Sequence, residues 1–272
     1  MDDNEMAKDP FHRIKNLVYL LTSEPNYSIF LEEAEKENAK LAKMPVVMGA
    51  RMHTAYDFFN EDKALSADIP RDLTVSESSL DYLLKRSASE VGDLLGFSHC
   101  FYAAKGLKAE SDDYSITSIY NNTVNPAKID ICYADMTMHV LPPTMAHEYV
   151  HFLQDAKACE FNDYIWDFKP LMEGFGRGVE RIVAEKYAAE KDDMLYLVRT
   201  QERVCTDIHD FVTKVIPEQK AKWKNRFVSF DGHWGTAAFL VLERKFGRGI
   251  YKEMINSNKP YEMMIEMLGG KR

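Results

Sequence analysis

The chain has 272 residues, 46% of them hydrophobic, and a formal net charge of −9 at pH 7. This length and composition allow one large domain, or one domain with an N-terminal extension, to bury a sizeable core. The negative charge argues against nucleic acid or an anionic membrane as the main partner, and the absence of a run of 18 apolar residues argues against a membrane-spanning helix.

The first predicted elements are helices. The segment up to about Lys43 includes the charged run 32–37 and is expected to form a helix with a solvated face. A second amphipathic helix is expected over about 79–95, where leucines recur at helical spacing and Gly96 provides a C-terminal stop. Residues 1–110 are accordingly predicted to form a mainly helical N-terminal region.

The hydrophobic pattern changes between about Tyr114 and Val140. Apolar residues alternate there as they do in strands, with turns at Asn121-Asn122 and Asn125-Pro126. After residue 180 the pattern returns to helices, which are expected at about 193–216, 233–246, 248–257 and 259–268.

The pentapeptide HEYVH at 147–151 carries the strongest functional signal, because it is the H-E-x-x-H arrangement of zinc hydrolases. It lies in a helix expected over about 144–157. Positions i and i+4 share one helix face, so His147 and His151 can both bind one zinc ion at about 2.0–2.1 Å. Glu148 is then placed to reach a metal-activated water. The alternative is that the two histidines are ordinary, partly buried residues of an amphipathic helix.

A catalytic zinc site usually has three protein ligands and an open fourth position. Gln154 and Lys157 stand where a metzincin would have glycine and histidine, so that class is excluded. Glu173 is the better candidate, because it lies on a second predicted helix whose glycines at 174, 176 and 178 would allow a close approach to the first. The alternative for Glu173 is a solvated glutamate on a helix surface.

HEYVH at 147–151 followed by Glu173-Gly174-Phe175 resembles the gluzincin clan of zinc metallopeptidases, which includes thermolysin and the alanyl-type aminopeptidases. The resemblance covers roughly residues 125–250, and its motif lies within 144–180. Position by position, it implies that the zinc ligands are His147, His151 and Glu173, that Glu148 is the general base, and that Glu180 matches a later acid of the family.

The resemblance also implies a fold. Residues 111–272 are expected to form a gluzincin-like core of the α+β class, mostly helical, in which a small sheet is followed by a zinc-binding helix pair and a C-terminal helical region. Arg177 departs from the family, because thermolysin-type members carry an acid there that hydrogen-bonds a ligand histidine. Since arginine cannot accept a hydrogen bond, another group must orient that imidazole.

Two residues are candidates for stabilising an oxyanion. His233 lies near the start of a stretch, beginning at Asp231, that resembles a helix found after the zinc core of many small gluzincins. Tyr164 stands nine residues before Glu173, much as a tyrosine does in thermolysin-type enzymes. The alternatives are a surface histidine and a loop aromatic that packs on the helix pair. The choice between the two donors is left open.

The sequence therefore predicts a zinc-dependent metallopeptidase that hydrolyses the bonds of a peptide or protein substrate through a metal-activated water, with Zn²⁺ as its cofactor. Two alternatives remain, a non-catalytic zinc-fold regulator or interaction module and a zinc amidohydrolase that acts on a non-peptide amide. The four cysteines, at 100, 132, 159 and 205, form no C-x-x-C pair, so we expect reduced thiols and a cytoplasmic protein.

Overall fold

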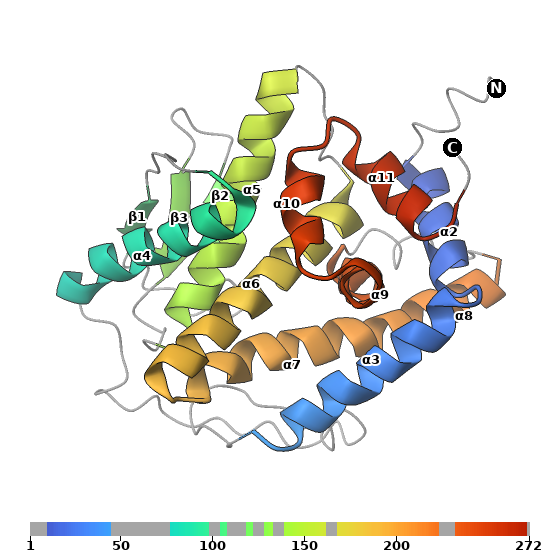
Figure 1. The fold of residues 1–272 in the computed structure, drawn as a ribbon, viewed down its shortest axis with the longest axis horizontal. Helices are drawn as coiled ribbons and strands as arrows, with labels where there is room; N and C mark the ends of the chain where they lie inside the picture. The colour runs from blue at the N-terminus through green and yellow to red at the C-terminus, as the bar shows by residue number, and fades with distance from the viewer. Residues whose placement is uncertain are drawn as a thin grey trace. The chain divides into compact units, whose positions relative to one another are not determined.

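The computed structural model describes residues 10–44, 77–97, 104–107, 118–121, 128–132, 139–161, 168–222 and 232–270 (Figure 1). Contacts within the chain group its residues into two compact units. The first unit comprises residues 1–39, 157–178 and 204–272, and the second comprises residues 40–156 and 179–203. The division between residues 1–110 and 111–272 stays a prediction.

The first unit begins with two helices, α2 (Pro10–Leu21) and α3 (Asn26–Leu41). The sequence predicted a helix up to about Lys43, and the structure interrupts it shortly before Asn26, where Pro25 has no N–H to offer a continuing helix. The Asn26 amide donates a 2.7 Å hydrogen bond to the carbonyl oxygen of Leu268 near the C-terminus. The buried apolar side chains of α2 recur at the spacing of one helix face: Ile14, Leu17, Val18 and Leu21.

The C-terminal part of the first unit is a run of short helices (Figure 1). α9 is the buried one, because every side chain from Thr236 to Leu242 is excluded from solvent. The Phe239 ring stacks on Tyr251 at 5.5 Å and meets Phe175 edge-on at 5.7 Å, which are favourable aromatic geometries. The run comprises η4 (Phe211–Val215), α8 (Ile216–Lys220), η6 (His233–Gly235), α9 (Thr236–Phe246), α10 (Gly249–Ile255) and α11 (Pro260–Met267).

The second unit contains α4 (Glu77–Leu95) and parts of three long helices, α5 (Leu141–Phe161), α6 (Lys169–Lys191) and α7 (Leu195–Asp210). Ion pairs between Arg86 and Glu190 and between Glu90 and Lys186 join α4 to the end of α6. The Arg86 guanidinium also lies 4.5 Å from the centre of a Tyr187 ring. The helix expected over 79–95 is confirmed as α4.

Three short strands of the second unit pair in the order β1 (Ala104–Leu107), β3 (Lys128–Cys132), β2 (Ser118–Asn121). β1 pairs with β3 in parallel and β2 pairs with β3 antiparallel. In register, Ala104 lies opposite Ile129, and Ser118 lies opposite Ile131.

The predicted α+β class is wrong, because the fold is all-helical in class. Among the residues whose burial the structure describes, the buried apolar side chains lie on helices or at their ends. The described part of the hydrophobic core is therefore built by helices packing on helices, and the strands are short, with four or five residues each. The apolar alternation over about 114–140 predicts strands, but alternation does not say how much of a core a sheet will form.

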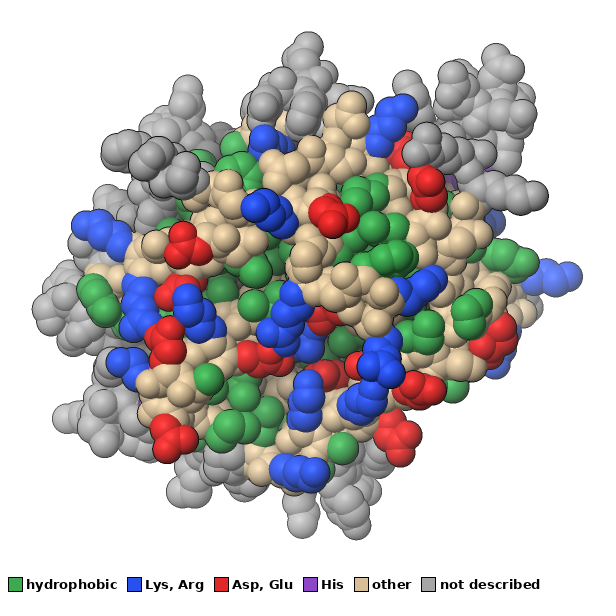
Figure 2. Space-filling model, viewed as in Figure 1, with side chains coloured by type: hydrophobic (Ala, Val, Ile, Leu, Met, Phe, Trp, Pro, Cys, Tyr) green, Lys and Arg blue, Asp and Glu red, His purple; other side chains and the backbone are tan. Residues whose placement is uncertain are grey.

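One face of the molecule carries charges of both signs. On the face shown in Figure 2, acidic and basic side chains are interspersed and form no large patch of one sign. No helix in the described ranges is long and apolar enough to cross a membrane.

Candidate metal centre

The two motif histidines lie on α5, which is longer than the sequence suggested. The helix begins at Leu141, so the two prolines that follow lie in its first turn, where a missing N–H leaves no hydrogen bond unmade. Thr144, expected near the start of the helix, lies one turn inside it and is buried. All side chains from Leu141 to His151 are buried, so both imidazoles project into the protein interior.

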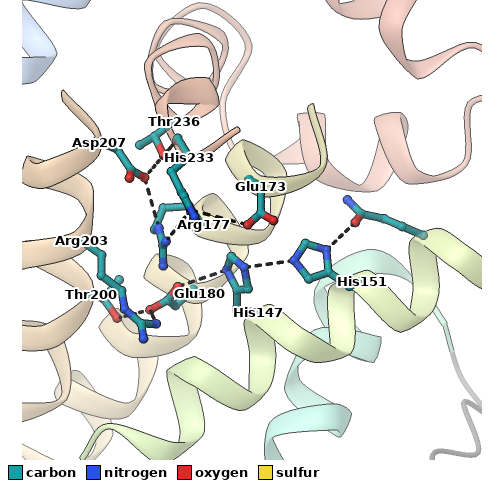
Figure 3. Close-up of polar contacts among 11 residues, drawn as sticks. His147, His151, Glu173, Arg177, Glu180, Thr200, Arg203, Asp207, His233 and Thr236 are labelled. Atoms are coloured by element: carbon teal, nitrogen blue, oxygen red, sulfur yellow. Dashed lines mark hydrogen bonds and ion pairs between the residues drawn. The ribbon is translucent and has the colours of Figure 1, made fainter. Parts of the chain in front are cut away.

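The imidazoles of His147 and His151 converge through their Nε2 atoms, which lie 3.1 Å apart (Figure 3). Their ring planes are nearly perpendicular, at 87°. Two nitrogens bound to one tetrahedral zinc at about 2.0–2.1 Å would lie about 3.3 Å apart, so the observed separation fits two ligands of one ion.

Each imidazole has an acceptor at its other nitrogen. Nδ1 of His151 lies 2.8 Å from Oε1 of Gln154, and Nδ1 of His147 lies 3.2 Å from Oε2 of Glu180. The second contact is at ion-pair distance but lacks the geometry of a hydrogen bond. A hydrogen on Nδ1, facing these acceptors, would leave the lone pair on Nε2, which is the tautomer that a metal ligand needs.

Glu180 is held in place by α7. Its side chain is fully buried, and its Oε1 accepts hydrogen bonds from Arg203 at 3.1 Å and from the Thr200 hydroxyl at 3.2 Å. Oε2 is the oxygen that faces His147. Glu180 is therefore the buried carboxylate that lies beside Nδ1 of His147.

Glu173 lies two turns before Glu180 on the same helix, so the two carboxylates share one face of α6. Glu173 is partly exposed, whereas Glu180 is not. Ligand atoms of His147, His151 and Glu173 all lie within 4.8 Å of one another. These three groups could together hold a metal ion.

The glycines near Glu173 serve a contact that the sequence did not predict. A Cβ on Gly174 would lie 2.4 Å from the Gly235 backbone, and a Cβ on Gly178 would lie 1.8 Å from the Tyr251 hydroxyl. Gly235 itself would meet the backbone of Pro170 at 1.8 Å. These positions let the start of α6 approach η6 closely, and η6 carries His233.

His233 is half exposed, with its Nδ1 3.7 Å from Oε2 of Glu173 and 3.4 Å from a terminal nitrogen of Arg177. The Nε of Arg177 lies 3.3 Å from Oδ2 of Asp207, which also accepts a hydrogen bond from Thr236. Burial raises the pKa of Asp207 above its ordinary value. Arg177, His233 and Thr236 favour the ionised carboxylate and so offset part of this increase in the pKa.

Two predicted site residues remain, Glu148 and Tyr164. Glu148 is buried on α5 directly after His147, and its role as a base stays a prediction. Tyr164 lies outside the described residues. Sequence reasoning missed the partners of the site: Gln154, Thr200, Arg203, Asp207 and Thr236. Gln154 could have been found, because it stands three residues after His151 on the same helix.

Comparisons with protein-family models, with curated proteins and with solved structures gave no match to this chain. The function must therefore be argued from the site itself.

Proposed function

We propose that this chain is a zinc-dependent metallopeptidase whose ligands are His147, His151 and Glu173. The observation that carries the proposal is the pair of Nε2 atoms 3.1 Å apart inside the protein. If both rings carry their hydrogen on Nδ1, two lone pairs face each other at this distance, which is unfavourable unless a cation lies between them.

A proton shared by the two rings would also relieve this repulsion, but it would make no use of Glu173. A metal ion uses all three donors. Two imidazoles and one carboxylate suit zinc, and they also suit non-haem iron. The H-E-x-x-H arrangement and the gluzincin resemblance favour zinc, and metal analysis of the purified protein separates the two.

The proposed hydrolysis assigns a separate role to each of several residues of the chain. Zinc bound by these ligands would supply Lewis acidity, which makes water a nucleophile near neutral pH. Glu148 is the proposed general base, which takes a proton from water and passes it to the leaving nitrogen. His233 or Tyr164 is the proposed donor to the developing oxyanion. Glu180 keeps His147 in its metal-binding orientation.

A peptide or protein is proposed as the substrate because gluzincins cleave peptide bonds. The cysteine pattern further leads us to propose a cytoplasmic location. Peptide cleavage tests the proposed substrate, and titration of the thiols tests the proposed location.

The test compares wild type with Glu148→Gln. Both proteins should bind one zinc per chain, because Glu148 is not a ligand. Glutamine keeps the shape of glutamate but cannot accept the proton, so hydrolysis of peptides from a mixed library should fall by about 10²–10⁴-fold. Equal rates would show that Glu148 is not the base. A zinc-loaded wild type that cleaves no peptide would overturn the peptidase proposal, and turnover of non-peptide amides alone would identify an amidohydrolase.

A further inference from the structure

Arg177 is a buried arginine with no place in the mechanism above. Its side chain is about 6% exposed, as is that of its partner Asp207. The carboxylate of Glu180 already lies beside the imidazole of His147. The guanidinium of Arg177 instead faces Asp207 on α7 and His233 on η6, from the same helix that carries Glu173 (Figure 3).

Asp207 holds Arg177 against His233. Asp207 binds the Nε of Arg177 and accepts a hydrogen bond from the Thr236 hydroxyl. That hydroxyl also lies 2.9 Å from the carbonyl oxygen of His233, but its single hydrogen can be donated to only one of the two oxygens. A terminal nitrogen of Arg177 lies 3.4 Å from Nδ1 of His233. The ring of His233 is therefore linked to one buried carboxylate through Arg177.

This arrangement fixes which ring nitrogen of His233 carries the hydrogen. A guanidinium can only donate hydrogen bonds, so Nδ1 of His233 must accept. The hydrogen of the neutral ring then lies on Nε2, the nitrogen that Arg177 does not contact. The Glu173 carboxylate would favour the opposite tautomer, but at 3.7 Å it is too far from Nδ1 for a hydrogen bond.

We propose that Arg177, held in place by Asp207, is a positioning residue that keeps His233 as an Nε2–H donor toward the substrate. This inference rests on the proposed function for its kinetic consequence, and on contacts within the first unit for its structural one. Half of the His233 side chain is exposed, so its ring can reach a bound substrate while Arg177 contacts Nδ1 from inside the protein.

The main test variant is Arg177→Met combined with Asp207→Asn. Removing Arg177 alone would leave a buried, unpaired carboxylate, which is strongly destabilising. The double variant leaves no buried charge at this place. Arg177→Lys is a second variant, because lysine keeps the charge but lacks the fork needed to reach two partners at once. Arg181→Lys is the matched control, since Arg181 is buried one turn further along α6 and pairs with Glu185 instead.

The first measurement is independent of activity. Two-bond ¹H–¹⁵N correlation spectra of the full-length, zinc-loaded protein show which ring nitrogen of each histidine is protonated, and His233→Asn assigns the signals. We expect the Nε2–H form for wild type and Arg181→Lys, and a mixture of tautomers for the double variant. An unchanged His233 signal in the double variant would overturn the proposal, whether or not the protein is a peptidase.

The second measurement is a kinetic double-mutant cycle at matched zinc content. Removing an oxyanion donor costs about 10²–10³-fold in kcat, so loosening one should lower kcat by about 10- to 100-fold with KM little changed. If Arg177 acts through His233, the same change made in a His233→Asn background should have almost no further effect. An equal loss in both backgrounds would refute positioning and leave Arg177 a purely structural role.

Discussion

Glu180→Gln tests the metal centre through a residue that is not a ligand. Glutamine has nearly the same shape, and its amide can still accept hydrogen bonds from Arg203 and Thr200 on α7. It loses the negative charge that faces Nδ1 of His147 at 3.2 Å. The imidazole becomes a weaker ligand and its orientation is less strongly fixed, and replacing such partners typically weakens metal binding by about 10- to 100-fold.

The loss of zinc affinity can be measured as a change in the free energy of unfolding. With free zinc buffered at 100 times the wild-type Kd, binding stabilises the folded wild type by about 2.7 kcal/mol. A Kd raised tenfold reduces this to about 1.4 kcal/mol, and a Kd raised 100-fold reduces it to about 0.4 kcal/mol. The zinc-dependent increase in the free energy of unfolding should therefore fall by more than about 1 kcal/mol, while the zinc-free proteins differ much less.

The assay is chemical denaturation of both proteins with and without buffered zinc, with direct competition against a chelator to measure Kd. Glu185→Gln is the matched control, because Glu185 is an acid of the same helix that pairs with Arg181 rather than with a histidine. If Glu180→Gln and Glu185→Gln retain zinc equally well, the argument that Glu180 orients a ligand imidazole is wrong.

Three further outcomes are expected. Glu173→Ala should lose zinc under conditions in which wild type keeps it, because two imidazoles alone compete poorly with buffer; full occupancy by metal analysis would remove Glu173 from the ligand set. Gly178→Ala should lower the free energy of unfolding by about 1–3 kcal/mol, because its Cβ would lie 1.8 Å from the Tyr251 hydroxyl, and denaturant unfolding measures this. Thiol titration of the denatured, unreduced protein should find four free cysteines, and a count of two or none would contradict the proposed reducing compartment.

The sequence predicted the helices of the site well because their signals are local. The spacing of His147 and His151 is a property of one helix, and so is the pairing of His151 with Gln154. The α4 helix and the C-terminal helices likewise follow from apolar periodicity and from stops such as Gly96 and Gly247. The predicted fold class was wrong, because the class of a fold depends on which elements form its core.

The polar partners of the site could not be predicted in the same way. Arg203 and Asp207 come from α7, and nothing in the helical pattern of α7 shows which residues of α6 its polar side chains will face. The glycines at 174 and 178 show the same limit. Their small size predicts a close approach to the helix of His147 and His151, but the neighbours that they meet are Gly235 and Tyr251, which lie far along the chain. Contacts between distant segments need a fold before they can be assigned.

The charges and donors of the centre limit what it can bind. Arg203 contacts Glu180, and Arg177 contacts Asp207, so these two buried carboxylates each have an arginine beside them. The proposed ligand set consists of two imidazoles, which bind a metal in their neutral form, and one carboxylate, Glu173. These nitrogen and oxygen donors suit a divalent transition-metal ion better than a monovalent cation. Because the free energy of binding such an ion is coupled to folding, a bound ion would also stabilise the folded chain.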